Sequence, residues 1–149
     1  MIKKLLFITL FFIGLNEINA QVEYKIITSI ESIVPNGLGR SRLISSEEER
    51  DFENYTTKQT EEDNNRNKSK RSDLRVKNYE ETKLLNFYNI GGIRFQNIAS
   101  NDVLVSSKIN TMTAAGWELA FVTSAVESDS GTNDGQGIFI TRYIFKRTK

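Results

Sequence analysis

The chain has 149 residues, with 20 basic and 19 acidic side chains, no histidine and no cysteine. The absence of histidine and cysteine removes the usual general bases, thiolate nucleophiles and transition-metal ligands, and it excludes disulfides. A net charge near zero gives no basic excess for binding nucleic-acid phosphates. The composition therefore predicts no metal, no cofactor and no nucleic-acid partner, and it favours a non-enzymatic role.

Residues 1–20 have the layout of a secretory signal peptide. Lys3 and Lys4 give a positive start, residues 5–15 form an apolar run, and a more polar stretch ends at Ala20, after which we expect cleavage. As a helix the apolar run spans about 16 Å, against about 30 Å of bilayer hydrocarbon, so we expect no stable membrane anchor after cleavage. Residues 21–149 then suit one exported domain, periplasmic or extracellular.

The first predicted strand covers residues 22–33. Val22, Tyr24 and Ile26 alternate with polar side chains, which predicts a strand with one buried and one wet face. The Pro35–Gly39 stretch predicts a turn, and residues 40–44 are expected to return as a short strand that forms a hairpin with residues 32–34.

Arg40 and Arg42 of this return strand have two interpretations. The favoured one is that they are solvated charges on an edge strand. The alternative is an anion-binding clamp beside the turn, as in a sensor of small anions.

Residues 45–83 form a long polar insertion, rich in charged, amide and hydroxyl side chains. So few apolar residues cannot offset the entropy of ordering the segment, which predicts a mobile insertion within the domain. The following residues 84–98 are apolar again, and we expect Ile93 and Phe95 in an extended piece that packs on the sheet. Gly91–Gly92 lacks the pattern of a phosphate loop and is interpreted as a backbone bend.

Residues 101–115 are predicted to form the main helix. Val105, Ile109 and Met112 follow helical spacing, and Ser100 or Asn101 is a suitable N-cap. Gly116 follows the last periodic residue, where a left-handed residue ends many helices.

Two strands are predicted after the helix, over residues 117–126 and 138–147. Trp117, Leu119 and Phe121 alternate onto one face of the first, and both faces of the second are apolar, so it is expected to be central. The connecting loop contains DSGTNDG at residues 129–135, which departs from the calcium-loop pattern and is interpreted as a hairpin tip.

Three pieces of sequence together resemble a known family. They are Glu23–Ile26 (EYKI), Gly116–Leu119 (GWEL) after Ile109, Asn110 and Met112, and Tyr143–Arg147 (YIFKR). The ordered set is similar to the bacterial family called domain of unknown function 4177. The resemblance covers less than half of the chain, and the polar insertion departs from the short form of the family. It implies a small α+β fold and no particular activity.

Trp117 and Glu118 are the other candidate ligand-binding residues. Trp117 is favoured as a core residue and would stack on a sugar only if exposed. Glu118 is favoured as a charge on the sheet face, paired with Lys25 or Arg142. Glu118, Glu127, Asp129 and Asp134 are the acids that a carboxylate-dependent hydrolase of glycans could use, and no spacing among them identifies a pair.

The sequence thus predicts a two-layer α+β domain with a mainly antiparallel sheet and one main helix on one face. The right-handed crossover rule places the first strand parallel to the 117–126 strand, with the last strand between them. The leading functional hypothesis is a non-catalytic module that binds a protein or a cell-envelope component, and the alternative is the glycan hydrolase. The predicted core consists of Tyr24, Ile26, Val105, Ile109, Met112, Trp117, Leu119, Phe121 and Phe145.

Overall fold

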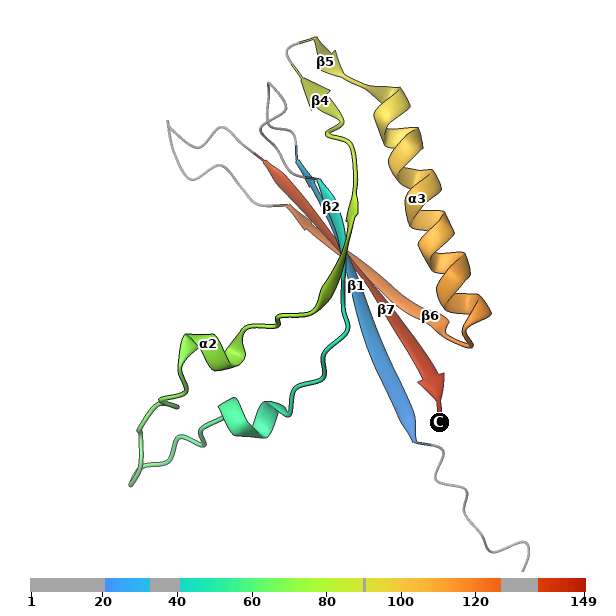
Figure 1. Cartoon of the computed structure of the whole chain (residues 1–149). Helices are drawn as coiled ribbons and strands as arrows, with labels where there is room; N and C mark the ends of the chain where they lie inside the picture. Colours follow the sequence, from blue (N-terminus) through green and yellow to red (C-terminus); the bar gives the residue numbers. More distant parts are fainter. Residues whose placement is uncertain (1–20, 33–40, 90, 127–136) are drawn as a thin grey trace, which may run out of the picture.

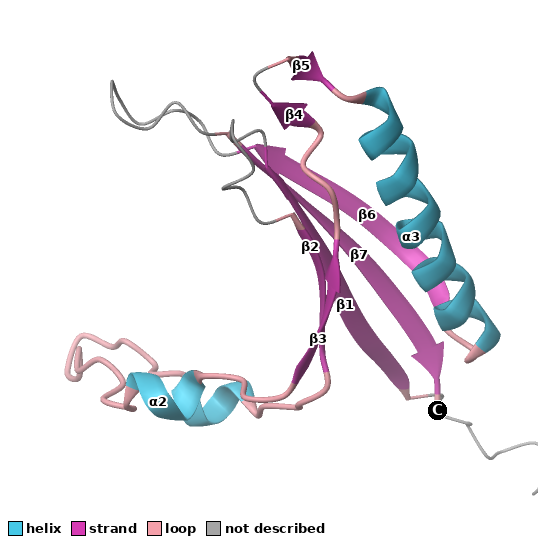
Figure 2. Ribbon diagram, turned by 45° about the horizontal axis from the view of Figure 1, so that its top comes forward, coloured by secondary structure: helices cyan, strands magenta, loops and turns pink. Residues whose placement is uncertain are grey.

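Figure 1 shows a computed structural model of the chain, which describes residues 21–32, 41–89, 91–126 and 137–149. A five-stranded antiparallel sheet has the order β3-β2-β1-β7-β6. The helix α3 (Phe95–Ala114) lies along one face of this sheet (Figure 2). The predicted two-layer α+β fold is confirmed. The strands of the sheet are β1 (Val22–Ser32), β2 (Arg42–Ser46), β3 (Tyr79–Lys83), β6 (Glu118–Val126) and β7 (Ile138–Thr148).

The last strand lies between the first strand and β6, as predicted. β7 is antiparallel to both, and its pairing with β1 runs from Val22 opposite Thr148 to Ser32 opposite Ile138. Successive side chains of β7 point to opposite faces of the sheet, so half of them face α3 and half face away from it. Both faces of this central strand are apolar, as predicted.

The predicted return strand is present but shifted. β2 pairs through Arg42–Ser45 with residues 27–30 of β1, and not with residues 32–34. β3, which the polar composition of the insertion did not predict, pairs with β2 along its whole length. Between them, residues 47–78 form an arm that extends away from the sheet (Figure 1). The arm contains two short helices, the 3-10 helix η2 (Phe52–Tyr55) and α2 (Arg71–Leu74).

The main helix begins earlier than predicted. A small hairpin of β4 (Tyr88–Asn89) and β5 (Gly92–Ile93) precedes it, and the helix starts at Phe95 without a side-chain cap. The expectation that Ile93 and Phe95 pack on the sheet is wrong, because they are 53% and 76% exposed. Asn101 is not an N-cap: it lies within α3 and is buried.

The end of the helix is as predicted. Gly116 has a φ of +83°. Its N–H donates to the Thr113 carbonyl at 3.0 Å, and the Trp117 N–H donates to the Met112 carbonyl at 3.0 Å. These two bonds form a Schellman motif, which satisfies carbonyls of the last turn and brings Trp117 against Met112.

The core lies between α3 and the sheet. Met112, Trp117 and Phe145 are buried as predicted, and Ile109 and Leu119 pack at its margin. Val105 is half-buried. The remaining buried hydrophobic residues are Ile27, Leu43 and Leu84.

Three predicted core residues are exposed instead: Tyr24, Ile26 and Phe121. β1 turns its other face toward α3, with Ile27 and Ser29 buried there. In β6, Leu119 pairs with Phe145 and Phe121 pairs with Ile144, so Ala120 is an extra residue in a β-bulge. The bulge moves Phe121 to the face opposite Leu119.

No helix within the described ranges is long and apolar enough to cross a bilayer. The predicted signal peptide, the Pro35–Gly39 turn, Arg40 and the 127–136 loop lie outside the described residues.

Candidate functional site

The face of the sheet that points away from α3, here called the open face, carries large hydrophobic side chains in contact with solvent. Figure 2 shows α3 on the opposite side of the sheet. Isolated exposed hydrophobic residues are common on proteins, but a group on one surface indicates an interaction site. The most exposed members are Val22 (45%), Tyr24 (64%), Ile26 (50%), Tyr79 (51%) and Phe121 (61%).

Strand register brings two of these side chains, Ile26 and Phe121, into one row. This row across β1, β7 and β6 contains Ile26, Ile144 and Phe121. Cross-strand neighbours on one face have Cβ atoms about 5 Å apart, so their side chains touch. A second row contains Ile30 of β1 and Ile140 of β7, which lie opposite each other. On each strand it is four residues away from the first row. The open face therefore carries two apolar rows.

Arg142 lies between the two apolar rows. It sits on the central strand β7, opposite Thr28 of β1 and Thr123 of β6, and it is exposed. No hydrogen bond or ion pair joins its guanidinium to any residue that the structure describes. An unpaired cation between two apolar rows gives this surface a point of attachment for a carboxylate.

Two ion pairs also lie on the open face. Glu118 lies 3.3 Å from Lys146, and Arg42 lies 2.6 Å from Glu81. The prediction that Glu118 pairs with Lys25 or Arg142 is therefore wrong. Lys25 is on the helix side of the sheet, where it lies 3.5 Å from Glu47.

A second concave region, here called the hollow, lies on the helix side near the start of β1. Its volume is about 440 Å³, and its lining includes Trp117. Trp117 is only 8% exposed, and the guanidinium of Arg147 stacks 4.4 Å from the centroid of its ring. Arg147 also donates to Glu23 at 2.9 Å. This arrangement uses the Trp117 ring within the protein and leaves no exposed aromatic face for a sugar.

One carboxylate of the hollow, that of Glu48, is held by internal partners. Glu48 accepts from the backbone N–H groups of Asn78 and Lys77 at 2.7 and 2.9 Å. These bonds, with that of Asn78 first, hold the pKa of Glu48 below its usual range. A glycosidase acid requires the opposite shift. Glu48 is therefore unsuited to be the acid of the alternative hydrolase.

The structure separates the residues predicted to bind ligand. Trp117 is in the core and Glu118 is at the start of β6, whereas Arg42 is on β2, beyond both β7 and β1. Arg42 is engaged by Glu81 and also donates to the Ser41 carbonyl at 2.7 Å. Arg40, Glu127, Asp129 and Asp134 lie outside the described residues, so the anion clamp and the acid pair remain predictions. In the part of the chain that is described, no group of three or more acidic side chains could hold a metal ion.

The sequence contains a signal of the open face, because Val22, Tyr24 and Ile26 alternate with polar side chains. The alternation predicts that Tyr24 and Ile26 lie in the core, whereas the structure exposes them on the open face. The polar character of the other face of β1, with Glu23 and Lys25, made that assignment natural, since the ion pairs that accommodate those charges come from distant residues.

Comparison with protein families, curated proteins and solved structures gives no match to this chain. The resemblance to the domain of unknown function 4177 family remains a prediction that rests on the three sequence pieces.

Proposed function

We propose that this chain is an exported, non-catalytic binding module that attaches to a protein or protein-bearing envelope component through its open face. The observation that carries the proposal is the group of exposed hydrophobic side chains on the open face, with Tyr24, Ile26 and Phe121 at least half exposed. The signal segment at residues 1–20 supports export, and the absence of histidine and cysteine supports a role without catalysis.

The size of the surface suits a protein partner. Its five most exposed hydrophobic residues present roughly 500 Å² to solvent, if an aromatic side chain contributes about 150–250 Å² when fully exposed. A stable protein interface buries about 800 Å² on each side, of which the apolar centre is only a part. The paired charges Glu118–Lys146 and Arg42–Glu81 are placed to form a polar rim.

The chemistry of the surface also restricts the partner. Exposed Tyr and Phe side chains with an unpaired Arg are the types that dominate binding energy at protein interfaces. We therefore expect the partner to present apolar side chains around a carboxylate that reaches Arg142.

The test is capture of partners from envelope extract by the tagged chain, compared with two Phe→Ser variants. Phe121→Ser removes an exposed ring from the open face, and Phe95→Ser removes a ring of similar exposure from the start of α3. We expect one set of proteins to bind the unchanged chain and Phe95→Ser, and to bind Phe121→Ser at least about tenfold more weakly. Arg142→Ala should weaken the same set. Equal capture by Phe121→Ser and Phe95→Ser would refute the proposal.

A further inference from the structure

The sheet ends on one side at β6, whose outer edge has no partner strand among the described residues. β6 is hydrogen-bonded only to β7. Eight of its nine residues are exposed, the exception being Leu119. A strand of this length offers unpaired backbone N–H and C=O groups over about 30 Å.

The two edges of the sheet differ in how they are protected. β3, at the other edge, has the sequence YEETK, and its Glu80 and Glu81 bind Lys108 and Arg42. β6 continues after Glu118 as LAFVTSAV, without a charge or a proline. Charges, prolines and covering segments are the usual means by which edge strands avoid pairing. From Leu119 to Val126, β6 has no charge or proline, and no strand among the described residues covers its outer edge.

The helix leaves space beside this edge. Val122 and Val126 are on the side of β6 that faces α3, since Val122 pairs with Tyr143 and Val126 with Phe139. They are nevertheless 45% and 59% exposed. The helix therefore covers the start of β6, around Trp117, and leaves the rest accessible to another strand.

We propose that two copies of this chain pair antiparallel through β6, with Thr123 on the twofold axis, to form one continuous sheet. A twofold axis perpendicular to the sheet keeps both helices on one side and joins the two open faces on the other. Such pairing closes the exposed edge and gives an assembly of fixed size. The inference is independent of the proposed binding function.

The side chains of β6 are complementary to themselves in this register. Opposite residues must share a face, and with Thr123 on the axis, Phe121 lies opposite Ala125 on the open face. Val122 lies opposite Ser124 on the helix side. Each large side chain thus faces a small one, and the central Thr–Thr pair is favourable across antiparallel strands. Glu118, the one charged residue of β6, is at the end of the strand, so the two copies place it far apart.

Charge distinguishes this contact from stacking of two open faces. Stacking centred on the face would bring together two Arg142 guanidinium groups, with no acid on either copy left free to separate them at that point. The edge of β6 has no such repulsion. A second copy is therefore favoured at the edge, while the open face suits an acidic partner of another kind.

Cysteine scanning tests the register, because the chain has no cysteine of its own. Single variants Val122→Cys, Thr123→Cys and Ser124→Cys are oxidised mildly, with Tyr79→Cys on the β3 edge and Val103→Cys on the outer side of α3 as exposed controls. A residue on the twofold axis meets its own copy, within reach of a disulfide. We expect most of the Thr123→Cys protein to become covalent dimer and little of either control.

Measurement of mass in solution tests the assembly. At roughly 100 µM protein, a dimer with a micromolar dissociation constant is almost fully formed. We expect the unchanged chain and Val103→Lys to have twice the mass of one chain, and Val122→Lys to have the mass of one, with circular dichroism unchanged in both variants. Both substitutions change an exposed valine to lysine, so a difference between them reports the contribution of the β6 edge to the dimer.

Three results would overturn the inference. The first is that the unchanged chain has the mass of a monomer at this concentration. The edge of β6 would then be available to pair with a strand of another protein. The second is a dimer that persists in Val122→Lys. The third is preferred cross-linking of Tyr79→Cys or Val103→Cys over Thr123→Cys, which would place the contact elsewhere.

Discussion

Asn101 holds the irregular segment between β3 and β4 against the helix. Its side chain is 1% exposed. Oδ1 accepts from the Leu85 N–H at 2.8 Å, and Nδ2 donates to the Leu85 carbonyl at 2.8 Å and to Glu31 at 3.1 Å. One amide therefore pairs with both backbone groups of Leu85 as a neighbouring strand would, which satisfies polar groups that must not be left unpaired in the interior.

We predict that Asn101→Ala lowers the free energy of unfolding by about 2–4 kcal/mol, because it leaves both Leu85 groups and Glu31 without this partner. Urea unfolding followed by the fluorescence of Trp117, the single tryptophan, measures the change. Asn110→Ala is the matched control on the same helix, since Asn110 is exposed, and it should change stability by less than about 0.5 kcal/mol. Equal effects of the two substitutions would contradict the role given to Asn101.

Asn101 and Gly116 show which residue roles a sequence reveals. Gly116 ends the helix through bonds to residues three to five positions away, so the local pattern was sufficient to predict it. Asn101 is equally suited to a helix N-cap and to a buried amide bridge. Its partners are 16 and 70 positions away, and only the tertiary fold selects between the two roles.

At the scale of elements, the alternation of β1 identified a strand but not the face that it buries. The helix side of β1 carries Glu23, Lys25 and Glu31, whose charges are met by Arg147, Glu47 and Asn101. These partners come from three other segments, so the apparently wet face could be turned inward. In β6 a single inserted residue, Ala120, reversed the face of every later side chain, as a shift of one residue does in any strand.

A matched pair of phenylalanines tests this assignment of faces. Phe145 is fully buried on the helix side, whereas Phe121 is 61% exposed on the open face. We predict that Phe145→Ala lowers the free energy of unfolding by about 3–5 kcal/mol. Phe121→Ala should cost less than about 1.5 kcal/mol, since most of its ring already contacts water. Denaturant titrations of both variants measure the difference, and a larger loss for Phe121→Ala would show that the faces are reversed.

The edge strand β3 is tied to α3 by the ion pair between Glu80 and Lys108. The hydrogen bond from Lys108 and its positive charge hold the pKa of Glu80 below its usual range. A lowered pKa in the folded state means that the pair stabilises the fold above the ordinary glutamate pKa of about 4.3, and that this stability is lost as the pH falls through the lowered value.

Glu80→Gln should therefore lower stability near neutral pH and have no effect in acid. Because the Glu80 side chain is 55% exposed, we expect less than about 1 kcal/mol. Thermal unfolding of both proteins at about pH 7 and about pH 3 measures the two differences. The conservative control is Glu61→Gln, which lies in the exposed arm. A Glu80→Gln effect that persists at low pH would contradict an ionic origin.

For the whole molecule, connection rules and composition predicted more than side-chain patterns did. The order β1-β7-β6 follows from the crossover rule, and the polar composition marks the arm, although the predicted insertion at 45–83 also contains β3. β3 was not predictable in this way, because YEETK has no apolar face and pairs with β2 through its backbone. The open face depends on how all strands are placed relative to α3, which no single segment of sequence records.

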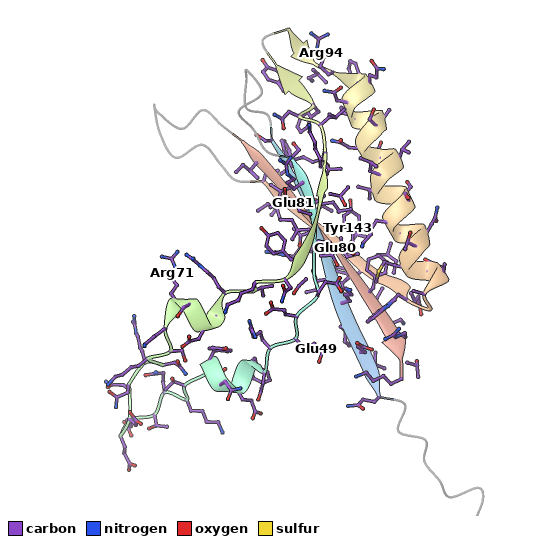
Figure 3. The ribbon with its side chains drawn as sticks, in the orientation of Figure 1. Glu49, Arg71, Glu80, Glu81, Arg94 and Tyr143 are labelled. Atoms are coloured by element: carbon purple, nitrogen blue, oxygen red, sulfur yellow. The ribbon has the colours of Figure 1, made fainter. Side chains whose placement is uncertain are left out.

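The arm is closed at its base by Glu48, and it makes its other described bonds largely within itself. Glu48 binds the Lys77 and Asn78 backbone next to the start of β3. Farther out, Tyr55 donates to the Asp73 carbonyl at 3.0 Å, and Arg71 points away from the rest of the molecule (Figure 3). The sheet therefore needs the base of the arm but little of its length.

We predict that replacing residues 50–75 with a short Gly/Ser linker changes the free energy of unfolding by less than about 1 kcal/mol, because loop-closure entropy varies slowly with length. The Trp117 emission and the unfolding midpoint should match those of the full chain. Glu48→Ala in the shortened chain is the informative companion, since it opens the base of the arm and should destabilise the β2–β3 pairing more than the shortening does. Loss of cooperative unfolding on shortening alone would show that the arm belongs to the folded unit, and the division of the molecule into sheet, helix and projecting arm would have to be redrawn.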